Sequence, residues 1–213
     1  MRYSVKEIFY SLQGEGFHAG RPAVFCRFAG CNLWSGREDD RSAAACNFCD
    51  TDIIGTDGPG GGIFANAGEL AGVVARFWPA GKSGSIQPFV VCTGGEPLLQ
   101  LDSELVHAFH RENLFIAVET NGTILPPENI DWLCVSPKAG AELVVRSGQE
   151  LKLVFPQKGA DPEKFARLDF QNFFLQPLDG SDLVRNTKIT VDYVLAHPKW
   201  RLSLQVHKIL KIK

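Results

Sequence analysis

Three cysteines carry the strongest chemical signal in the chain. Cys46 and Cys49 bracket an aromatic residue in Cys46-Asn47-Phe48-Cys49, and Cys31 lies upstream of them. The other three cysteines each stand in an apolar strand-like run, where we expect small buried hydrophobes and no ligand role: Cys26, Cys92 and Cys134. Thiolates are soft ligands that favour zinc or iron–sulfur clusters. A structural zinc site closes with four protein ligands, whereas an iron–sulfur cube held by three cysteines keeps one iron open. The spacing therefore suggests a metal centre with a vacant coordination position.

A second segment favours this interpretation over the alternative, in which Cys46 and Cys49 are ordinary thiols. Residues 93–97 read Thr-Gly-Gly-Glu-Pro and follow the apolar run 89–91, which predicts a loop that leaves the end of a buried strand. Adjacent glycines expose backbone groups to a ligand, although a Gly-Gly pair alone is also common in ordinary turns. The functional interpretation therefore depends on the combination with the cysteines.

Together, the three cysteines and the Gly-Gly-Glu segment resemble the radical S-adenosylmethionine (SAM) superfamily. The resemblance implies a 4Fe-4S cluster whose open iron is chelated by SAM, and a reduced cluster that cleaves SAM to a 5′-deoxyadenosyl radical. The chain departs from the commonest spacing, because residues 32–45 separate the first two cysteines. Loop closure costs grow only logarithmically with length, so the three sulfurs can still reach one cluster. We predict a short helical excursion through residues 42–45.

Further matches narrow the resemblance to the 7-carboxy-7-deazaguanine synthase family. They lie in the segments 7–16, 25–34, 49–52, 93–97, 119–123, 136–138 and 176–179. The resemblance implies conversion of 6-carboxy-5,6,7,8-tetrahydropterin to 7-carboxy-7-deazaguanine, on the route to queuosine and other 7-deazapurines. The implied steps are hydrogen abstraction, radical ring contraction and loss of ammonia.

The same resemblance assigns site residues, with the radical itself supplied by SAM and the cluster. Cluster ligands are Cys31, Cys46 and Cys49, and Thr51 is the ligand of Mg²⁺. SAM-binding residues are Phe48, Cys49, Asp50, Gly95, Ser136, Pro137, Lys138, Gln176, Pro177, Leu178 and Asp179. Substrate-binding residues are Leu12, Gln13, Gly14, Arg27, Thr93, Glu119, His207 and Lys213, the last through the terminal carboxylate.

Two of these assignments also have a physical basis, and each has a competing interpretation. Arg27 lies between Phe25 and Phe28 in an apolar run, where a guanidinium could clamp the substrate carboxylate bidentately. Magnesium prefers oxygen ligands, which suits the hydroxyl of Thr51. Without the family pattern, Arg27 could be a partly exposed structural arginine and Thr51 a turn residue.

Composition limits the range of functions. The chain has 213 residues, a formal charge of −2 and 45% hydrophobic residues, which predicts one domain over 1–213 and no basic surface for nucleic acid. Six cysteines, no leader-like segment and no apolar run near twenty residues predict a cytoplasmic protein without a membrane anchor. The resemblance adds an electron donor such as flavodoxin and a homodimer.

The elements that must position these residues alternate between strands and helices. We expect strands at 23–29, 89–92, 115–119, 133–135, 151–154, 173–175 and 202–206. Expected helices are 67–77, 102–113, 162–167 and 186–196, the second capped by Asp102 and the fourth by Asn186 or Thr187. The glycine-rich segment 55–62 is expected to be a flexible connection.

Such alternation predicts an α/β fold with parallel strands and right-handed crossovers. At 213 residues the chain is short for an eight-unit barrel, and the resemblance implies a partial, six-unit TIM-type barrel with trimmed helices and an inserted cluster loop at 31–49. The motif segments would then converge at the carboxyl ends of the strands. A glycyl-radical activating enzyme and a zinc-stabilised binding module remain as alternatives.

Overall fold

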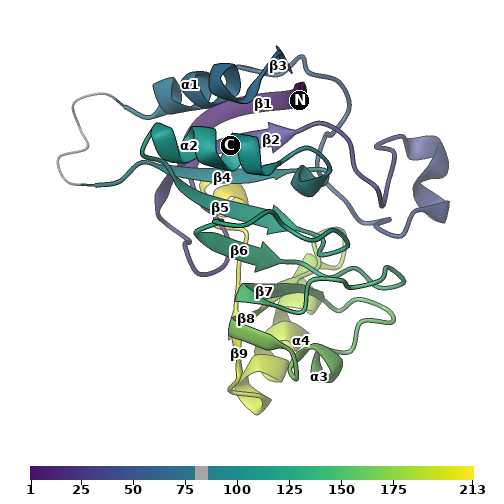
Figure 1. The fold of residues 1–213 in the computed structure, drawn as a ribbon. Helices are drawn as coiled ribbons and strands as arrows, with labels where there is room; N and C mark the ends of the chain where they lie inside the picture. The colour runs from purple at the N-terminus through teal and green to yellow at the C-terminus, as the bar shows by residue number, and fades with distance from the viewer. Residues whose placement is uncertain (80–85) are drawn as a thin grey trace.

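The computed structural model describes residues 1–79 and 86–213, in which nine strands form one sheet (Figure 1). The strands are β1 (Tyr3–Leu12), β2 (Pro22–Phe28), β3 (Gly62–Phe64), β4 (Phe89–Gly94), β5 (Phe115–Thr120), β6 (Trp132–Val135), β7 (Ser147–Phe155), β8 (Asp169–Pro177) and β9 (Trp200–Leu202). The helices are α1 (Ala67–Phe77), α2 (Ser103–Arg111), α3 (Pro162–Phe165), α4 (Leu183–Ala196) and α5 (Val206–Leu210), with 3-10 turns η1 (Glu38–Ala43) and η2 (Pro97–Leu99).

The sheet has the order β3-β1-β2-β4-β5-β6-β7-β8-β9. Every pairing from β2 through to β9 is parallel, while β1 runs antiparallel to both of its neighbours. The prediction of an α/β fold with parallel strands is therefore confirmed. Because the parallel strands share one direction, their carboxyl ends lie along one edge, where the loops of Figure 1 extend to the right.

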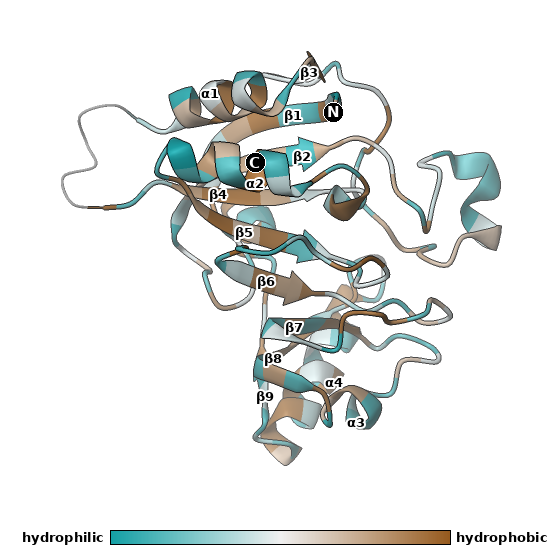
Figure 2. Ribbon diagram, viewed as in Figure 1, coloured by the Kyte–Doolittle hydropathy of each residue, from teal (hydrophilic) through white to brown (hydrophobic). Residues whose placement is uncertain are grey.

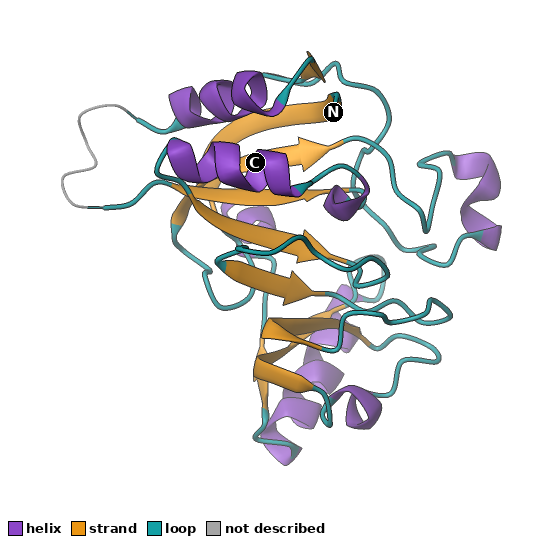
Figure 3. Ribbon diagram, in the orientation of Figure 1, coloured by secondary structure: helices purple, strands orange, loops and turns teal. Residues whose placement is uncertain are grey.

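Helices cover the outer face of the sheet unevenly. Leu70 of α1 and Leu105 and Phe109 of α2 are fully buried against a core that contains Cys26 and Cys92 of the strands. Figure 2 shows the corresponding apolar colouring of the strands beneath these helices. Figure 3 shows loops, and no helix, between β5, β6 and β7. Cys26 and Cys92 thus have the expected role of small buried hydrophobes.

The inner face of the sheet begins with an apolar layer. Phe9 of β1 stacks on Phe25 of β2, with ring centroids 5.0 Å apart. The other members of this layer are Ala23 of β2, Phe89 and Val91 of β4, and Ala117 of β5. Because side chains in a strand alternate between its faces, residues two positions further along β2, β4 and β5 face the same interior.

The N-terminal strand β1 is absent from the expected strands because its alternation is broken. A register shift between Val5 and Glu7 leaves Val5, Lys6 and Ile8 all buried, so the period of two is lost at this point. Strands with a bulge give a weak sequence signal for this reason.

The expected strand at 202–206 is wrong in its extent. β9 ends at Leu202, and Val206 begins α5. The backbone leaves β8 because the amide of Val206 donates instead to the carbonyl of Gly14, in the loop after β1. Formation of this contact across the molecule cannot be inferred from local residue preferences.

Three smaller expectations also need correction. Segment 55–62 packs closely on β1, where a Cβ at Gly61 would lie 2.2 Å from the carbonyl oxygen of Lys6. The helical turn of the insertion is η1, earlier than 42–45, because acidic residues occupy its first turn and Glu38 pairs with Arg41. α4 begins before Asn186, and the side-chain amide of Asn186 donates a hydrogen bond to the carbonyl oxygen of Leu178.

Among the helices described, none has the length and apolar character needed to cross a bilayer.

Candidate active site

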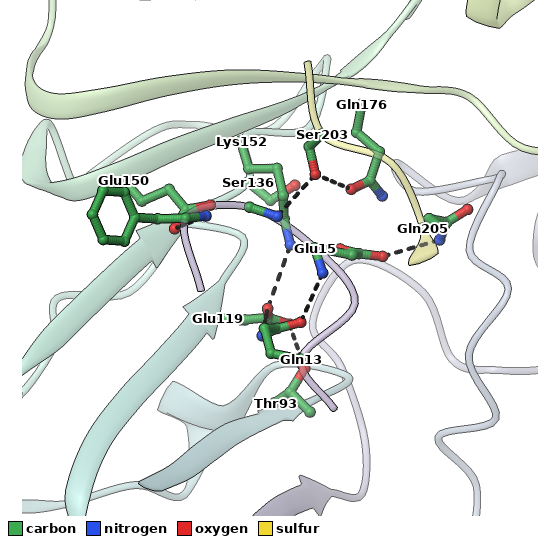
Figure 4. Close-up of polar contacts among 12 residues, drawn as sticks. Gln13, Glu15, Thr93, Glu119, Ser136, Glu150, Lys152, Gln176, Ser203 and Gln205 are labelled. Atoms are coloured by element: carbon green, nitrogen blue, oxygen red, sulfur yellow. Dashed lines mark hydrogen bonds and ion pairs between the residues drawn. The ribbon is translucent and has the colours of Figure 1, made fainter. Parts of the chain in front are cut away.

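A row of polar side chains crosses the inner face of the sheet beyond the apolar layer. Arg27 of β2 is in register with Thr93 of β4, and Glu119 of β5 is in register with Cys134 of β6. Cys134 is in turn opposite Glu150 of β7. Thr93 Oγ1 donates to Glu119 Oε2 at 3.2 Å (Figure 4). Adjacent strands are about 4.8 Å apart, so the sheet fixes the spacing of this row.

Lys152, also on β7, connects the row to the loop after β1. Its Nζ lies 2.5 Å from Glu15 Oε2 and 3.4 Å from Glu119 Oε1 (Figure 4). Burial opposes the positive charge, but the carboxylates of Glu119 and Glu15 raise the pKa of Lys152 well above its usual value. Burial likewise opposes ionisation of Glu15, but Lys152 lowers the pKa of that carboxyl to about 2. Both groups are therefore charged at neutral pH.

Gln13 places the loop after β1 against Glu119. Its Nε2 donates to Glu119 Oε1 at 3.0 Å, and its Oε1 accepts from the backbone N–H of Glu15 at 3.1 Å. Glu119 therefore accepts hydrogen bonds from side chains of three different elements, Gln13, Thr93 and Lys152. The carboxylate is held in one orientation by these contacts.

The C-terminal segment meets the same loop. The N–H of Gly16 donates to Ser203 Oγ at 2.9 Å, and Gln205 Nε2 donates to Glu15 Oε1 at 3.1 Å (Figure 4). A Cβ on Gly14 would lie 2.3 Å from His207 Nδ1, so only glycine allows this close approach. The contacts place His207, the first turn of α5, at the cavity wall.

A basic group lies at the β1–β2 side of the row. Arg27 Nε donates to Glu7 Oε1 at 3.0 Å, and Lys213 Nζ pairs with Glu7 Oε2. Although burial acts in the opposite direction, Lys213 and Arg27 lower the pKa of Glu7. Ser11 Oγ donates to the terminal carbonyl oxygen of Lys213 at 2.6 Å. The group thus brings two cationic side chains, Arg27 and Lys213, against the single carboxylate side chain of Glu7.

The three motif cysteines line one cavity of about 280 Å³ together with Arg27, Thr93 and Glu119 of the polar row. A hydrogen bond from the Cys46 thiol lowers the pKa of Cys49 to about 6 and raises the pKa of Cys46, and burial raises the pKa of Cys31. Within residues 1–79 and 86–213, no group of three or more His, Cys, Asp or Glu side chains has the arrangement of a single-ion site. The donor set is three thiols, which matches a cluster that keeps one iron open.

A fourth cysteine, Cys134, lines the same cavity from β6. It is 4% exposed and stands between Glu119 and Glu150 in the register of the sheet. Burial, reinforced by the negative charge of Glu150, raises the pKa of Cys134 well above its usual value. Cys134 is therefore a protonated thiol of the polar row, in agreement with the expected buried role.

Arg41, in the insertion, fixes the turn that carries Cys46 and Cys49. Its Nη1 donates to the carbonyl oxygens of Asn47 at 3.2 Å and of Cys49 at 2.8 Å. Nε and Nη2 form a bidentate pair with Glu38 at 2.7 and 2.6 Å. The guanidinium also lies 4.1 Å from the ring centroid of Trp34. The insertion thus supports the cysteine turn through one well-anchored side chain.

The Gly-Gly-Glu segment contacts the Cys31 loop and the loop after β5. A Cβ at Gly95 would lie 2.0 Å from the carbonyl oxygen of Gly30, which explains the need for glycine. Glu96 is fully buried and accepts from the N–H of Asn121 at 2.8 Å and from Thr120 Oγ1 at 2.8 Å. Burial raises the pKa of Glu96 despite these hydrogen bonds. Its role is to join two loops at the carboxyl edge of the sheet.

Lys208 of α5 bridges two of the residues expected to bind SAM. Its Nζ pairs with Asp50, beside the cysteine turn, and with Asp179 Oδ2 at 2.5 Å in the loop after β8. Lys138, after β6, donates to Ser136 Oγ at 2.8 Å, and burial lowers the pKa of Lys138. The loops after β6 and β8 are thereby ordered around the same cavity.

The structure brings the expected site residues together, with one exception. The cavity is lined by Leu12, Gln13, Gly14, Arg27, Cys31, Cys46, Phe48, Cys49, Asp50, Thr51, Thr93, Gly95, Glu119, Ser136, Lys138, Gln176, Pro177, Leu178, Asp179, His207 and Lys213. Pro137 is buried and does not line it. Its two sequence neighbours, Ser136 and Lys138, do line the cavity, so the family pattern marks the segment and not each member.

Sequence reasoning missed several residues of the site. Glu15 and Gln205 line the cavity with Lys152, while Arg41 and Lys208 support its loops. One signal was available, because Lys152 lies in the strand expected at 151–154 and Glu150 comes just before it. Both alternate with leucines, so their side chains share one face if the strand begins one residue earlier. Two charged residues on the same face of a buried strand indicate an interior site.

Comparisons with known proteins agree with this geometry. No protein-family model matches the chain. It is similar to the 7-carboxy-7-deazaguanine synthases of Caulobacter vibrioides, 61% identical over 99% of each chain, and of Burkholderia multivorans, 58% identical over 100% of each. The corresponding protein of Bordetella pertussis is 60% identical over 100% of each chain. The crystal structure of QueE from Escherichia coli superimposes with a TM-score of 0.68 and 28% identity, covering 97% of this chain and 95% of that one.

Proposed function

The chain belongs to the 7-carboxy-7-deazaguanine synthase family, and we propose that it converts 6-carboxy-5,6,7,8-tetrahydropterin to 7-carboxy-7-deazaguanine with loss of ammonia. Members of this family are radical SAM enzymes of queuosine biosynthesis. The observation that carries the proposal is one cavity that joins three cysteine thiols to a carboxylate-rich wall and a basic group. A pterin that carries a carboxylate has complementary features. The glycyl-radical and zinc-module alternatives are set aside by this family membership.

The cysteine segment is suited to a 4Fe-4S cluster. Cys31, Cys46 and Cys49 would hold it through three thiolates, and the donor set leaves one iron for SAM. When bound and reduced, the cluster and SAM supply a 5′-deoxyadenosyl radical that removes hydrogen from a substrate carbon. Phe48, Asp50, Gly95, the segment 136–138 and the segment 176–179 would bind SAM from the same cavity.

The polar row would orient the substrate. Glu119 is fixed by three donors and still offers lone pairs to the N–H groups of an aminopyrimidine, together with the amide of Gln13. Arg27, two strands away, would hold the substrate carboxylate with the guanidinium edge that Glu7 does not occupy. Thr93 lies between them in the register of the sheet. The two ends of one small molecule are thereby assigned to Glu119 and Arg27.

The remaining assignments complete the proposal. The Thr51 hydroxyl, at the cavity wall, would bind Mg²⁺ together with the substrate carboxylate. His207 would contact the substrate, as would Leu12, Gly14 and the terminal carboxylate of Lys213. We further propose that residues 1–213 act as one radical SAM domain, whose sheet of mostly parallel strands is the partial barrel of that superfamily. A flavodoxin-type donor and a homodimer are carried by the family resemblance.

An anaerobic assay tests the function directly. Reconstituted protein is incubated with 6-carboxy-5,6,7,8-tetrahydropterin, SAM, Mg²⁺ and a reductant, and 7-carboxy-7-deazaguanine is detected by mass. Iron and sulfide analysis on the same sample measures the cluster. We expect about four iron atoms per chain and product that depends on SAM. Absence of product from protein with an intact cluster would refute the substrate assignment, and a preparation with zinc and no iron would refute the radical chemistry.

A further inference from the structure

Lys152 is a buried charged group that the proposed function does not yet use. Its side chain is only 6% exposed, and it lies in the cavity wall with Nζ directed at two carboxylates (Figure 4). A buried ammonium is costly unless it is paired, so its position calls for a function or a strong structural need. The apolar core on the outer face of the sheet does not require this charge, because Lys152 faces the interior together with the polar row.

The charges around Lys152 come from five elements. Glu15, in the loop after β1, and Glu119, on β5, contact Nζ directly. Cys134 of β6 and Glu150 of its own strand also raise the pKa of Lys152, and the nearby Lys138 has its own pKa lowered in part by Lys152. Burial raises the pKa of Glu150. The direct partners are thus two carboxylates that share one ammonium.

These two carboxylates differ in what they offer the cavity. Glu15 is bound by Lys152 at 2.5 Å and by Gln205 at 3.1 Å, so it forms the closer ion pair. Glu119 is farther from Nζ, at 3.4 Å, and its other donors are the neutral side chains of Gln13 and Thr93. Once the Lys152–Glu15 pair is counted as neutral, Glu119 retains its negative charge for a ligand.

We propose that Lys152, with Glu15 as its counter-ion, is a positioning residue that keeps Glu119 an ionised, oriented acceptor for the N–H donors of the pterin. The proposal rests on the proposed function, because the donors are those of the substrate's aminopyrimidine edge. Without the ammonium, Glu15 and Glu119 become neighbouring carboxylates that are largely shielded from solvent, at 16% and 24% side-chain exposure, and one of them takes up a proton. A protonated Glu119 loses acceptor sites and adds a donor that faces the substrate's own donors.

The test measures binding separately from catalysis. Pterin-6-carboxylate, an oxidised and fluorescent analogue of the substrate, is titrated into reconstituted enzyme with SAM between pH 6 and pH 8. We expect Lys152→Met to weaken its affinity by about tenfold or more at pH 6, with a smaller loss at pH 8, where the carboxylates are both ionised. Wild-type affinity should vary little over this range. The exposed Lys158, for which no ion pair is found in the part of the chain that the structure describes, provides the matched control as Lys158→Met.

A second substitution distinguishes positioning from packing. Lys152→Met combined with Glu15→Gln removes one positive and one negative charge, so Glu119 remains the single carboxylate. We expect the double variant to recover most of the lost affinity and the flat pH profile. Loss of packing by the lysine stem would not be rescued in this way. Failure of rescue, or an unchanged affinity in Lys152→Met, overturns the proposal.

Glu15→Gln alone keeps the test decisive if Lys152→Met does not fold. Lys152 then pairs with Glu119 only, and we expect the affinity for pterin-6-carboxylate to change by less than about threefold. A loss of tenfold or more would mean that Glu15 itself contacts the ligand, which contradicts its assignment as a counter-ion. Wild-type enzyme that has an intact cluster but neither binds the analogue nor forms product would refute the proposed function instead.

Discussion

The polar row and the cysteine segment line the same cavity but are held in place by different means. Arg27, Thr93 and Glu119 are on neighbouring parallel strands, so backbone hydrogen bonds fix their spacing. Residues 31–51 contain no strand, and their only regular element is the 3-10 turn η1. Their geometry comes from side-chain contacts such as those of Arg41. The substrate end is therefore built by the sheet, and the cofactor end by local contacts and the cofactor itself.

The sharpest test of this difference removes the cysteine ligands one at a time. We expect Cys31→Ala, Cys46→Ala and Cys49→Ala each to abolish product formation, because two thiolates cannot hold the cluster in its reactive state. Binding of pterin-6-carboxylate should change far less, since the row is fixed by the sheet. Iron, sulfide and product are measured together with the fluorescence titration.

Cys26→Ala is the matched control for these variants. Cys26 is fully buried on the outer face of β2 and does not line the cavity. Its loss removes a small apolar side chain and is expected to cost about 1 kcal/mol of stability while the iron content stays the same. Full turnover by any of the three motif variants would remove that cysteine from the ligand set.

A second prediction concerns the support of the cysteine turn. Arg41→Gln loses the charge-assisted hydrogen bonds to the carbonyls of Asn47 and Cys49 and the pair with Glu38. We expect iron to be lost to a chelator about tenfold faster than in the wild type, from the usual strength of such bonds. The loss is followed anaerobically by the visible absorbance of the cluster.

Arg37→Gln is the control for Arg41, because Arg37 belongs to the same insertion and is exposed, with no ion pair among residues 1–79 and 86–213. It should lose iron at the wild-type rate. Equal rates in Arg41→Gln and Arg37→Gln would show that the cysteine turn does not depend on the insertion. The cysteine segment would then be held in place by the cluster alone.

The same contrast explains how much could be predicted from the sequence. Parallel strands and α1 follow from apolar runs and periodicity, and the bounds of α1 match the expectation of 67–77. Asp102 caps α2 as expected, with Oδ1 accepting from the N–H of Leu105 at 2.9 Å. The assigned site residues came from motif resemblance, and the cavity gathers all of them except Pro137.

Contacts between distant segments could not be predicted in this way. Lys152 is 137 positions from Glu15, and Lys208 is 158 positions from Asp50. No local preference encodes such pairs, because they depend on where the loop after β1 and the C-terminal segment meet. The alternation of Glu150 and Lys152 on β7 indicated an interior charge, but not its partners.

A smaller effect is expected at Lys208, which joins the cysteine segment to the loop after β8 through exposed ion pairs. Lys208→Met removes the bridge between Asp50 and Asp179 and should weaken SAM binding by about threefold, since exposed ion pairs are weak. The difference should shrink in high salt because screening weakens the pairs in the wild type. Equilibrium dialysis with SAM at low and high salt measures both. Lys211→Met, in the exposed tail, is the control, and an effect that is independent of salt would contradict the ionic role.

The smallest effect is expected far from both ends, at His18, where the structure predicts a change in stability alone. Its Nε2 is buried and has no hydrogen-bond partner among the residues that the structure describes, and its ring centroid lies 4.4 Å from that of Trp132 and 5.1 Å from that of Phe89. Burial, with the nearby charge of Arg21, lowers the pKa of His18 to about 4. The unfolded chain, with an ordinary pKa of about 6.5, therefore binds the proton more tightly than the folded protein.

Folding stability must consequently fall as the pH drops from about 6.5 towards 4, because protons favour the unfolded state in that window. We expect this group to cost about 1 kcal/mol at pH 5 relative to pH 7.5, after allowance for the partial exposure of the ring. His18→Phe keeps an aromatic ring and cannot titrate. The melting temperature of this variant minus that of the wild type should therefore be about 2–4 °C higher at pH 5 than at pH 7.5. Turnover at pH 7.5 should be the same for both proteins, since His18 does not line the cavity. A difference between the two melting temperatures that is constant with pH would mean that His18 is not held neutral by the fold.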